Sequence, residues 1–262
     1  MRNRFRQLHE TGTFVMPNPW DVGSAKLLAS LGFPALATTS LGHAATLGRA
    51  DGQVTRDELL VHVEALVKAV DVPINVDAER CFGDDAKEVA RTARLLAATG
   101  AAGFSIEDWN PTSGAIDPID VATERVAAAA EVAGQEGMTL TARAENHVRG
   151  VDDLDDTIRR LISYRDAGAP VVYAPHLRGL DRIKRLVREV EVPVNVISLL
   201  EGPSVGELGA VGVRRVSTGG ALSRGAFGAL ERAGLELLEQ GTSSYLSTAI
   251  SAADLTARFS NP

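Results

Sequence analysis

Acidic residues gather at the ends of two short apolar runs in the middle of the chain. PINVDAE ends with Asp77 and Glu79, and GFSIED ends with Glu107 and Asp108. Carboxylates two positions apart on a strand point the same way, and they repel each other unless a cation lies between them. Carboxylate oxygens together with water are the ligands that Mg²⁺ and Mn²⁺ prefer. One such acid alone is more often a helix cap or the partner of an arginine, but Asp77, Glu79 and Glu107 together predict a metal site.

A second set of polar residues could bind an anionic substrate. Arg143 closes the run TLTAR, and a guanidinium can hold a carboxylate or phosphate in a bidentate way and stabilise developing negative charge. It could equally serve only to neutralise Glu107 or Glu145, because buried charges are normally paired. The hydroxyls and backbone amides of Thr39 and Ser40, at the end of ATTS, could bind a substrate carboxylate, although this is also ordinary strand composition.

These residues need a scaffold that brings distant strand ends together. Short apolar runs alternate with helical stretches along the 262 residues, which predicts an α/β protein. In a barrel of parallel strands, all carboxyl ends meet at one face. We therefore predict a single (β/α)8 TIM-type barrel over residues 1–262; an open Rossmann-type sheet is the alternative, but its Gly-rich fingerprint is missing. The predicted strands are 14–16, 35–39, 74–77, 103–107, 139–143, 171–174, 194–197 and 214–218.

The end of the chain forms a separate feature. Residues 243–262 lie beyond the eighth strand-helix unit, and apolar side chains recur there at helical spacing, at Leu246, Ile250 and Leu255. We predict one extra amphipathic C-terminal helix from Ser243 to Phe259, which could pack on a partner subunit.

Composition excludes several classes of protein. The net charge is −7, the isoelectric point is about 5.3, and acids and bases are interspersed, which argues against a nucleic-acid partner. Cys81 is the single cysteine, so an internal disulfide or a cysteine-rich zinc site is excluded. No apolar run approaches the about 20 residues that span a bilayer, and the start lacks an apolar signal core. We expect a cytoplasmic protein with no membrane partner.

Four segments in order resemble one known family. TTSLGHAATLGRAD, NVDAERCFGD, GFSIED and TARAEN are similar to motifs of the isocitrate lyase and phosphoenolpyruvate mutase superfamily, and the likeness runs from about Phe14 to Gly225. Its members are barrels that bind Mg²⁺ and an α-keto acid or its enolate, and they cleave or form a C–C or P–C bond next to it. The resemblance implies that Asp77 is the principal direct metal ligand, with Glu79 and Glu107 in the shell, mostly through water.

The resemblance also implies roles for individual residues. Asp51, in GRAD, matches a loop aspartate near the metal and the reacting group. The segment from Thr39 to Leu41 matches the one whose amides and hydroxyl hold a pyruvyl carboxylate. The implied catalytic residues are Arg143, Asp51 and Glu107, and the implied substrate-binding residues are Thr39, Ser40, Leu41, Asn195 and Arg143.

The chain departs from the family pattern in two places. The segment after Asp108, WNPTSGAIDPID, lacks both the lid cysteine of isocitrate and methylisocitrate lyases and the lid lysine of phosphoenolpyruvate mutase and phosphonopyruvate hydrolase. In the metal loop, Arg80 and Cys81 precede Phe82, and Cys81 replaces a glycine. If that position has a positive φ, Cys81 is strained there.

We therefore expect a Mg²⁺-dependent enzyme, with Mn²⁺ as a substitute. It would be a carbon–carbon lyase or decarboxylase that acts on a small 2-oxo or 2-hydroxy (di)carboxylate through an enolate. One alternative is a P–C bond mutase or hydrolase acting on phosphonopyruvate-like substrates. Another is a catalytically silent barrel with a binding or assembly role. The resemblance further implies a late helix exchanged between subunits, and hence a homotetramer or homodimer.

Overall fold

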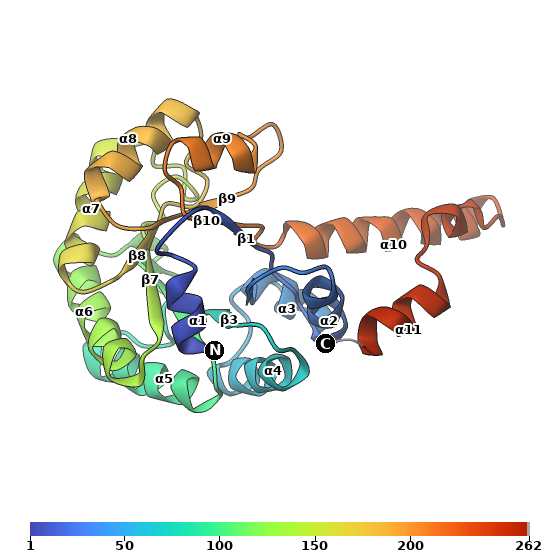
Figure 1. The fold of residues 1–262 in the computed structure, drawn as a ribbon, viewed down its shortest axis with the longest axis horizontal. Coiled ribbons are helices and arrows are strands. Elements are labelled where there is room, and N and C mark those ends of the chain that lie inside the picture. Colours follow the sequence, from blue (N-terminus) through green and yellow to red (C-terminus); the bar gives the residue numbers. More distant parts are fainter. Residues whose placement is uncertain (261–262) are drawn as a thin grey trace.

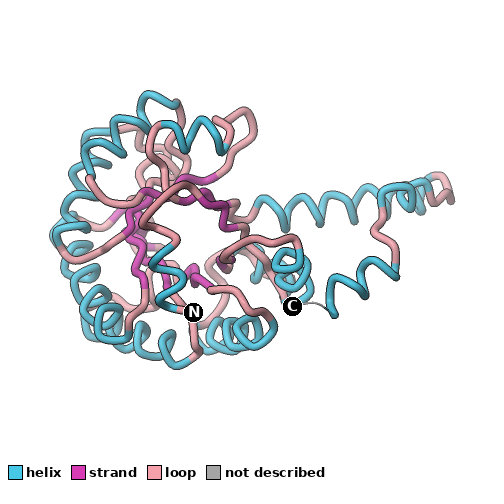
Figure 2. The backbone as a smooth tube through the Cα atoms, in the orientation of Figure 1, coloured by secondary structure: helices cyan, strands magenta, loops and turns pink. Residues whose placement is uncertain are grey.

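Eight short parallel strands surround the centre of the molecule (Figures 1 and 2). The computed structural model describes residues 1–260. The strand order is β1-β10-β9-β8-β7-β4-β3-β2, which closes into a nearly complete (β/α)8 TIM-type barrel and confirms the predicted fold. The strands are β1 (Phe14–Met16), β2 (Leu36–Ala37), β3 (Ile74–Asp77), β4 (Gly103–Glu107), β7 (Thr139–Arg143), β8 (Val171–Tyr173), β9 (Val194–Ile197) and β10 (Arg215–Ser217).

Helices follow the strands and cover the outside of the barrel (Figure 2). Several begin at side chains that cap them: Asp21, Thr55 and Ser204 each form a capping box with the residue three positions on. The core between helices and strands is built mainly from Ala, Val and Leu, as the low aromatic content requires. The helices of the barrel are α1 (Arg2–Gln7), α2 (Val22–Ser30), α3 (Ser40–Thr46), α4 (Arg56–Ala69), α5 (Ala86–Ala98), α6 (Ile119–Glu136), α7 (Leu154–Asp166), α8 (Leu180–Val190) and α9 (Val205–Ala210).

Three short elements were not predicted from the sequence. Helix α3 starts directly after β2 because the Thr39 hydroxyl accepts a hydrogen bond from the Gly42 amide, so the predicted strand 35–39 ends early. Helix α1 closes the amino-terminal end of the barrel, where its Phe5 packs against Phe14 of β1. The segment after Glu107 contains a small antiparallel hairpin of β5 (Trp109–Asn110) and β6 (Ala115–Ile116).

The C-terminal part leaves the barrel. Helix α10 (Ala221–Glu239) projects away from it, and only Ser223 of this helix is buried (Figure 1). The prediction of one helix from Ser243 to Phe259 is wrong: a 3₁₀ turn, η1 (Ser244–Thr248), is followed by an extended Ala249 and then by α11 (Ala252–Ser260). Ser251 causes the second start, because its hydroxyl accepts from the Asp254 amide at 3.0 Å. Helix α11 turns back and packs against α2.

No helix in residues 1–260 combines the length and the apolar character needed to cross a membrane.

Candidate active site

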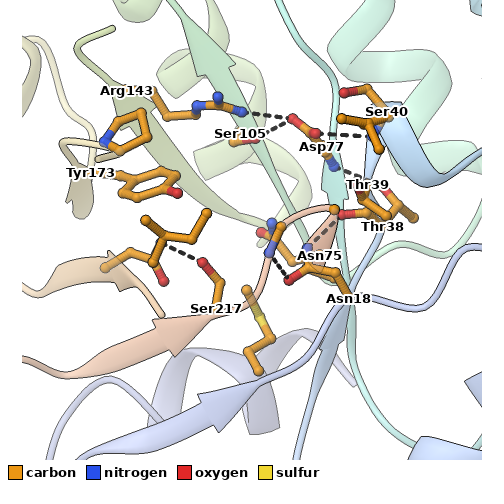
Figure 3. Close-up of a pocket in the computed structure, with 18 of the residues that line it drawn as sticks. Asn18, Thr38, Thr39, Ser40, Asn75, Asp77, Ser105, Arg143, Tyr173 and Ser217 are labelled. Carbon is orange, nitrogen blue, oxygen red and sulfur yellow. Dashed lines mark hydrogen bonds and ion pairs between the residues drawn. The ribbon is translucent and has the colours of Figure 1, made fainter. Parts of the chain in front are cut away.

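Arg143 ties three carboxylates together at the carboxyl ends of the strands. Its Nη1 donates to Asp77 Oδ1 at 2.8 Å, and its Nη2 lies 3.2 Å from Glu107 Oε2. The same Nη2 donates to Glu145 Oε1 at 2.8 Å. This follows from the register, in which Glu107 on β4 is the direct neighbour of Arg143 on β7. The guanidinium is therefore already neutralised by residues of the chain itself, and Figure 3 shows its contact with Asp77.

The loop after β2 is fixed to the same aspartate. The Ser40 amide donates to Asp77 Oδ2 at 3.1 Å, and the Asp77 amide donates to the Thr38 hydroxyl at 2.8 Å. These bonds place Thr39, Ser40 and Leu41 along the wall of a cavity of about 220 Å³ inside the mouth of the barrel. Gly220 makes room for Leu41, because a Cβ there would lie 2.8 Å from Leu41 Cδ2.

The predicted metal-binding acids divide between two adjoining pockets. Asp77 faces the cavity inside the barrel, whereas Glu79 and Glu107 face a neighbouring pocket of about 200 Å³ under the hairpin. Asp51 and Arg143 line both pockets. The structure thus brings all four predicted acids to one region, but it does not place them around one point.

The electrostatics of this region show an excess of negative charge. Burial, with the charges of Asp77 and Asp51, raises the pKa of Glu79 to about 7. Burial also raises the pKa of Glu107 well above its usual range, although Arg143 opposes this shift. A nearby cation would stabilise the ionised form of both carboxylates.

The donor set fits Mg²⁺ or Mn²⁺ in kind, because it consists of carboxylate oxygens with a deficit of positive charge. Within residues 1–260, however, no three His, Cys, Asp or Glu side chains converge closely enough to bind a metal ion by themselves. Asp77, Glu79 and Glu107 would therefore hold such an ion together with water or substrate oxygens, which is the usual situation for Mg²⁺.

The loop after β3 is strained. Glu79, Cys81 and Phe82 have φ values of +48°, +58° and +51°, where residues other than glycine are uncommon. Cys81 thus adopts a conformation for which a glycine would be favoured, which meets the condition under which the sequence analysis expected strain there. Its side chain is fully buried in the main core, and burial raises the pKa of the thiol to about 12. Arg80 also lines the second pocket, and its Nη2 donates to Asp117 Oδ2 at 2.7 Å.

A layer of polar residues lies one step deeper in the barrel, and the sequence analysis missed most of it. Residues two positions apart on a strand point the same way, so the residue two positions before one at the carboxyl end of a strand also faces the inside of the barrel. By this rule Asn75 could have been predicted from Asp77, Ser105 from Glu107, and Arg215 from Ser217. Asn195, the one predicted member, accepts a hydrogen bond from Arg215 and donates to Ser217 at 3.0 Å. Further residues of the cavity are Asn18, Tyr173 and His176.

A barrel of parallel strands with acidic side chains and an arginine at the carboxyl ends of its strands defines a class of α/β-barrel proteins with a polar site at that face. The family model for phosphoenolpyruvate phosphomutase matches residues 5–238. The chain therefore belongs to this family, within the isocitrate lyase and phosphoenolpyruvate mutase superfamily.

Three relatives illustrate this similarity. A Burkholderia cenocepacia J2315 structure, described as a candidate lyase or mutase, is 46% identical, covers 100% of this chain and 96% of that one, and superimposes with a TM-score of 0.95. An uncharacterized protein of Mycobacterium tuberculosis is 33% identical over 82% of this chain and 81% of its own length. The 2,3-dimethylmalate lyase of Eubacterium barkeri is 27% identical over 76% of this chain and 71% of its own length.

Proposed function

We propose that the protein is a Mg²⁺-dependent carbon–carbon lyase or decarboxylase for a small 2-oxo or 2-hydroxy (di)carboxylate. The observation that carries this proposal is the carboxylate cluster around Arg143, which adjoins a polar cavity large enough for a small acid. The similarity to 2,3-dimethylmalate lyase supports the choice of reaction class.

Each group has a physical role in this proposal. Mg²⁺ held by Asp77, Glu79 and Glu107, directly or through water, would act as a Lewis acid toward a substrate oxygen. Arg143 fixes Asp77 and Glu107 in position, and its guanidinium borders the cavity in which the substrate would lie. Thr39, Ser40 and Leu41 shape the wall against which the substrate lies. Glu107 and Asp51 stand at the second pocket, where a proton could be exchanged with the leaving fragment.

The hairpin over the second pocket supplies neither a thiol nor an amine to the reaction. Trp109 and Pro111 line that pocket, and the hairpin segment from Trp109 to Ile116 carries neither a cysteine nor a lysine. Decarboxylation needs no acid at the leaving group, so a site without a lid thiol can perform it. A substituted malate would need a base for its hydroxyl, and Asp51 and Glu107 are the groups placed for that task.

A turnover panel tests this proposal. The protein with Mg²⁺ is incubated with 2-oxo and 2-hydroxy diacids and with phosphonopyruvate, and products are followed by proton NMR. We expect pyruvate or a related 2-oxo acid from at least one diacid, lost on addition of EDTA and restored by Mg²⁺. Turnover that persists in EDTA would rule out the metal-dependent assignment.

The family model itself favours a second candidate, P–C bond chemistry, because it describes phosphoenolpyruvate phosphomutase. Phosphorus NMR of the protein with phosphoenolpyruvate, Mg²⁺ and a trap for phosphonopyruvate separates the two. We expect no phosphonate signal. A third possibility is a silent barrel with a binding role; it predicts no turnover on any substrate, and it does not require Mg²⁺ binding in a calorimetric titration.

A further inference from the structure

Arg215 is a buried cation that has no negative partner among residues 1–260. It lies on β10, is 2% exposed, and makes three side-chain contacts, all with neutral groups. Its Nε donates to Asn195 Oδ1 at 2.9 Å, its Nη2 donates to the Thr141 hydroxyl at 2.9 Å, and its Nη1 lies 3.3 Å from His9 Nε2.

His9 is neutral in this arrangement. Its Nδ1 lies 2.9 Å from the Phe5 carbonyl oxygen and donates to it, which leaves the Nε2 lone pair to accept from Arg215. Burial and the charge of Arg215 lower the pKa of His9 to about 3. The histidine therefore adds no charge of either sign beside the guanidinium.

Arg143 and Arg215 face the same cavity but differ in charge balance. Paired residues on neighbouring strands connect them: Arg143 is paired with Tyr173, Tyr173 with Asn195, and Asn195 with Arg215. Three carboxylates neutralise Arg143, whereas no carboxylate of the described residues contacts Arg215. Of these two arginines, Arg215 is therefore the one whose charge is available to an anion in the cavity.

An unpaired buried guanidinium is energetically unfavourable, and burial lowers the pKa of Arg215 to about 9. This value still lies above neutral pH, so the group remains mostly charged instead of releasing its proton. Nearby, the Asn75 Oδ1 is buried and has no hydrogen-bond partner in the part of the chain that the structure describes. Asn75, Ser217 and Tyr173 lie around the same cavity (Figure 3).

The cavity has room for a ligand. Its volume of about 220 Å³ is several times the about 30 Å³ that one water occupies in the liquid. Polar groups at its inner end can each bind a carboxylate oxygen: the guanidinium of Arg215, the hydroxyl of Ser217 and the amide nitrogens of Asn75 and Asn195.

We propose that Arg215 forms an anion-binding subsite at the inner end of the barrel cavity, which receives a carboxylate of the substrate. The subsite selects a dicarboxylate over a monocarboxylate, since one carboxylate enters toward Arg215 while the rest of the molecule stays near Asp77 and Arg143. The claim that this subsite selects the substrate rests on the proposed lyase function. The claim that it binds an anion is independent of that function.

Calorimetric titration of EDTA-treated protein with malonate tests the subsite, with acetate as the monocarboxylate. We expect wild-type protein to bind malonate at least tenfold more tightly than acetate. Arg215→Met should lose that preference, and Arg215→Lys should weaken it because a bidentate fork is lost. Arg214→Met is the matched control: it removes the same charge from the next residue, whose Nη1 donates to the Gly12 carbonyl oxygen on the exposed surface, and it should bind as wild type.

Urea unfolding without ligand provides a second measurement. A cation without a partner stabilises little, so Arg215→Met should unfold at a urea concentration no lower than that for wild type, and malonate should raise that concentration for wild type and Arg214→Met only. Malonate binding by Arg215→Met at wild-type affinity would overturn the proposal, as would failure of wild type to bind malonate. If Arg215→Met turns over substrate with an unchanged KM, the subsite proposal is wrong and the lyase function still holds. If the wild-type protein binds malonate but turns over no substrate, the lyase function is wrong and the subsite still holds.

Discussion

Arg143 donates from Nη1 to Asp77 Oδ1 across 2.8 Å, and the two residues are 66 positions apart in the sequence. This bond makes Arg143 an internal counter-ion for the acidic cluster. The sequence analysis had left two roles open for Arg143, this one and the binding of a substrate anion. It also fixes Asp77 at the mouth of the barrel, where that residue holds the Ser40 amide with its second oxygen. The acidic cluster and the segment from Thr39 to Leu41, which lines the cavity, thus belong to one hydrogen-bonded network.

Asp77→Ala should reduce kcat/KM at least about 100-fold, since it removes the proposed principal metal ligand and the anchor of Arg143. The fold should survive, because the Asp77 side chain is partly exposed at 18% and contributes little packing. Asp84→Ala is the control, since that side chain is 86% exposed and its removal leaves Arg80 paired with Asp117. Full Mg²⁺-dependent turnover by Asp77→Ala would show that the metal assignment is wrong.

Arg143→Met should destabilise the fold by roughly 3 kcal/mol, because three buried or half-buried carboxylates lose their shared cation. Mg²⁺ should then raise the melting temperature of Arg143→Met more than that of wild type, since the added cation relieves a greater repulsion. Differential scanning fluorimetry with and without Mg²⁺ measures both. Equal Mg²⁺ shifts in the two proteins would argue against a cation site between these acids.

The sequence predicted the barrel because short apolar runs alternate with helical stretches, several of which begin at a capping side chain. Those signals are local, so β3, β4 and β7 begin and end at the predicted residues. The partners of Arg143 could not be predicted, since they depend on register between strands far apart in the sequence. Arg215 was missed for a similar reason: its sequence places it at the start of a strand, and only the closed barrel shows that it points inward.

The pH dependence of stability should reflect His62. Burial, and then the charge of His43, lowers the pKa of His62 to about 4, and the two rings stack with centroids 3.8 Å apart. The unfolded chain takes up a proton near pH 6.5 and the folded one only near pH 4, so this contribution to stability is full above pH 6.5 and is lost as pH falls toward 4. It amounts to no more than about 3 kcal/mol. Urea unfolding between pH 7 and 4.5 should show a smaller decline for His62→Gln than for wild type, whereas His176→Gln, at a more exposed site, should follow wild type.

Cys81 gives a prediction about backbone strain. At a φ of +58°, glycine is favoured over alanine by about 1 kcal/mol, the reverse of the order in ordinary positions. Cys81→Gly should therefore unfold at a higher urea concentration than Cys81→Ala, although both lose the buried sulfur. The wild-type thiol should resist alkylation in the folded state, because it is buried and its pKa is raised to about 12. Greater stability of Cys81→Ala would show that this loop does not hold the strained conformation.

Helix α10 leads to a proposal about assembly. Apolar side chains on this projecting helix are open to solvent, with Leu230 67% and Leu238 83% exposed. Phe227 and Leu230 border a groove that Leu41 of α3 also lines. Exposed apolar surface on this scale is typical of an interface, and we propose that a second copy covers it in a homodimer or homotetramer.

Sedimentation velocity should show an oligomer for wild type and a shift toward monomer for Leu230→Glu combined with Leu238→Glu. Leu200→Glu, which changes an equally exposed leucine on the loop after β9, should leave the oligomer intact. A folded wild-type monomer at all concentrations tested would contradict the proposal, because the helix would then stay exposed without a partner.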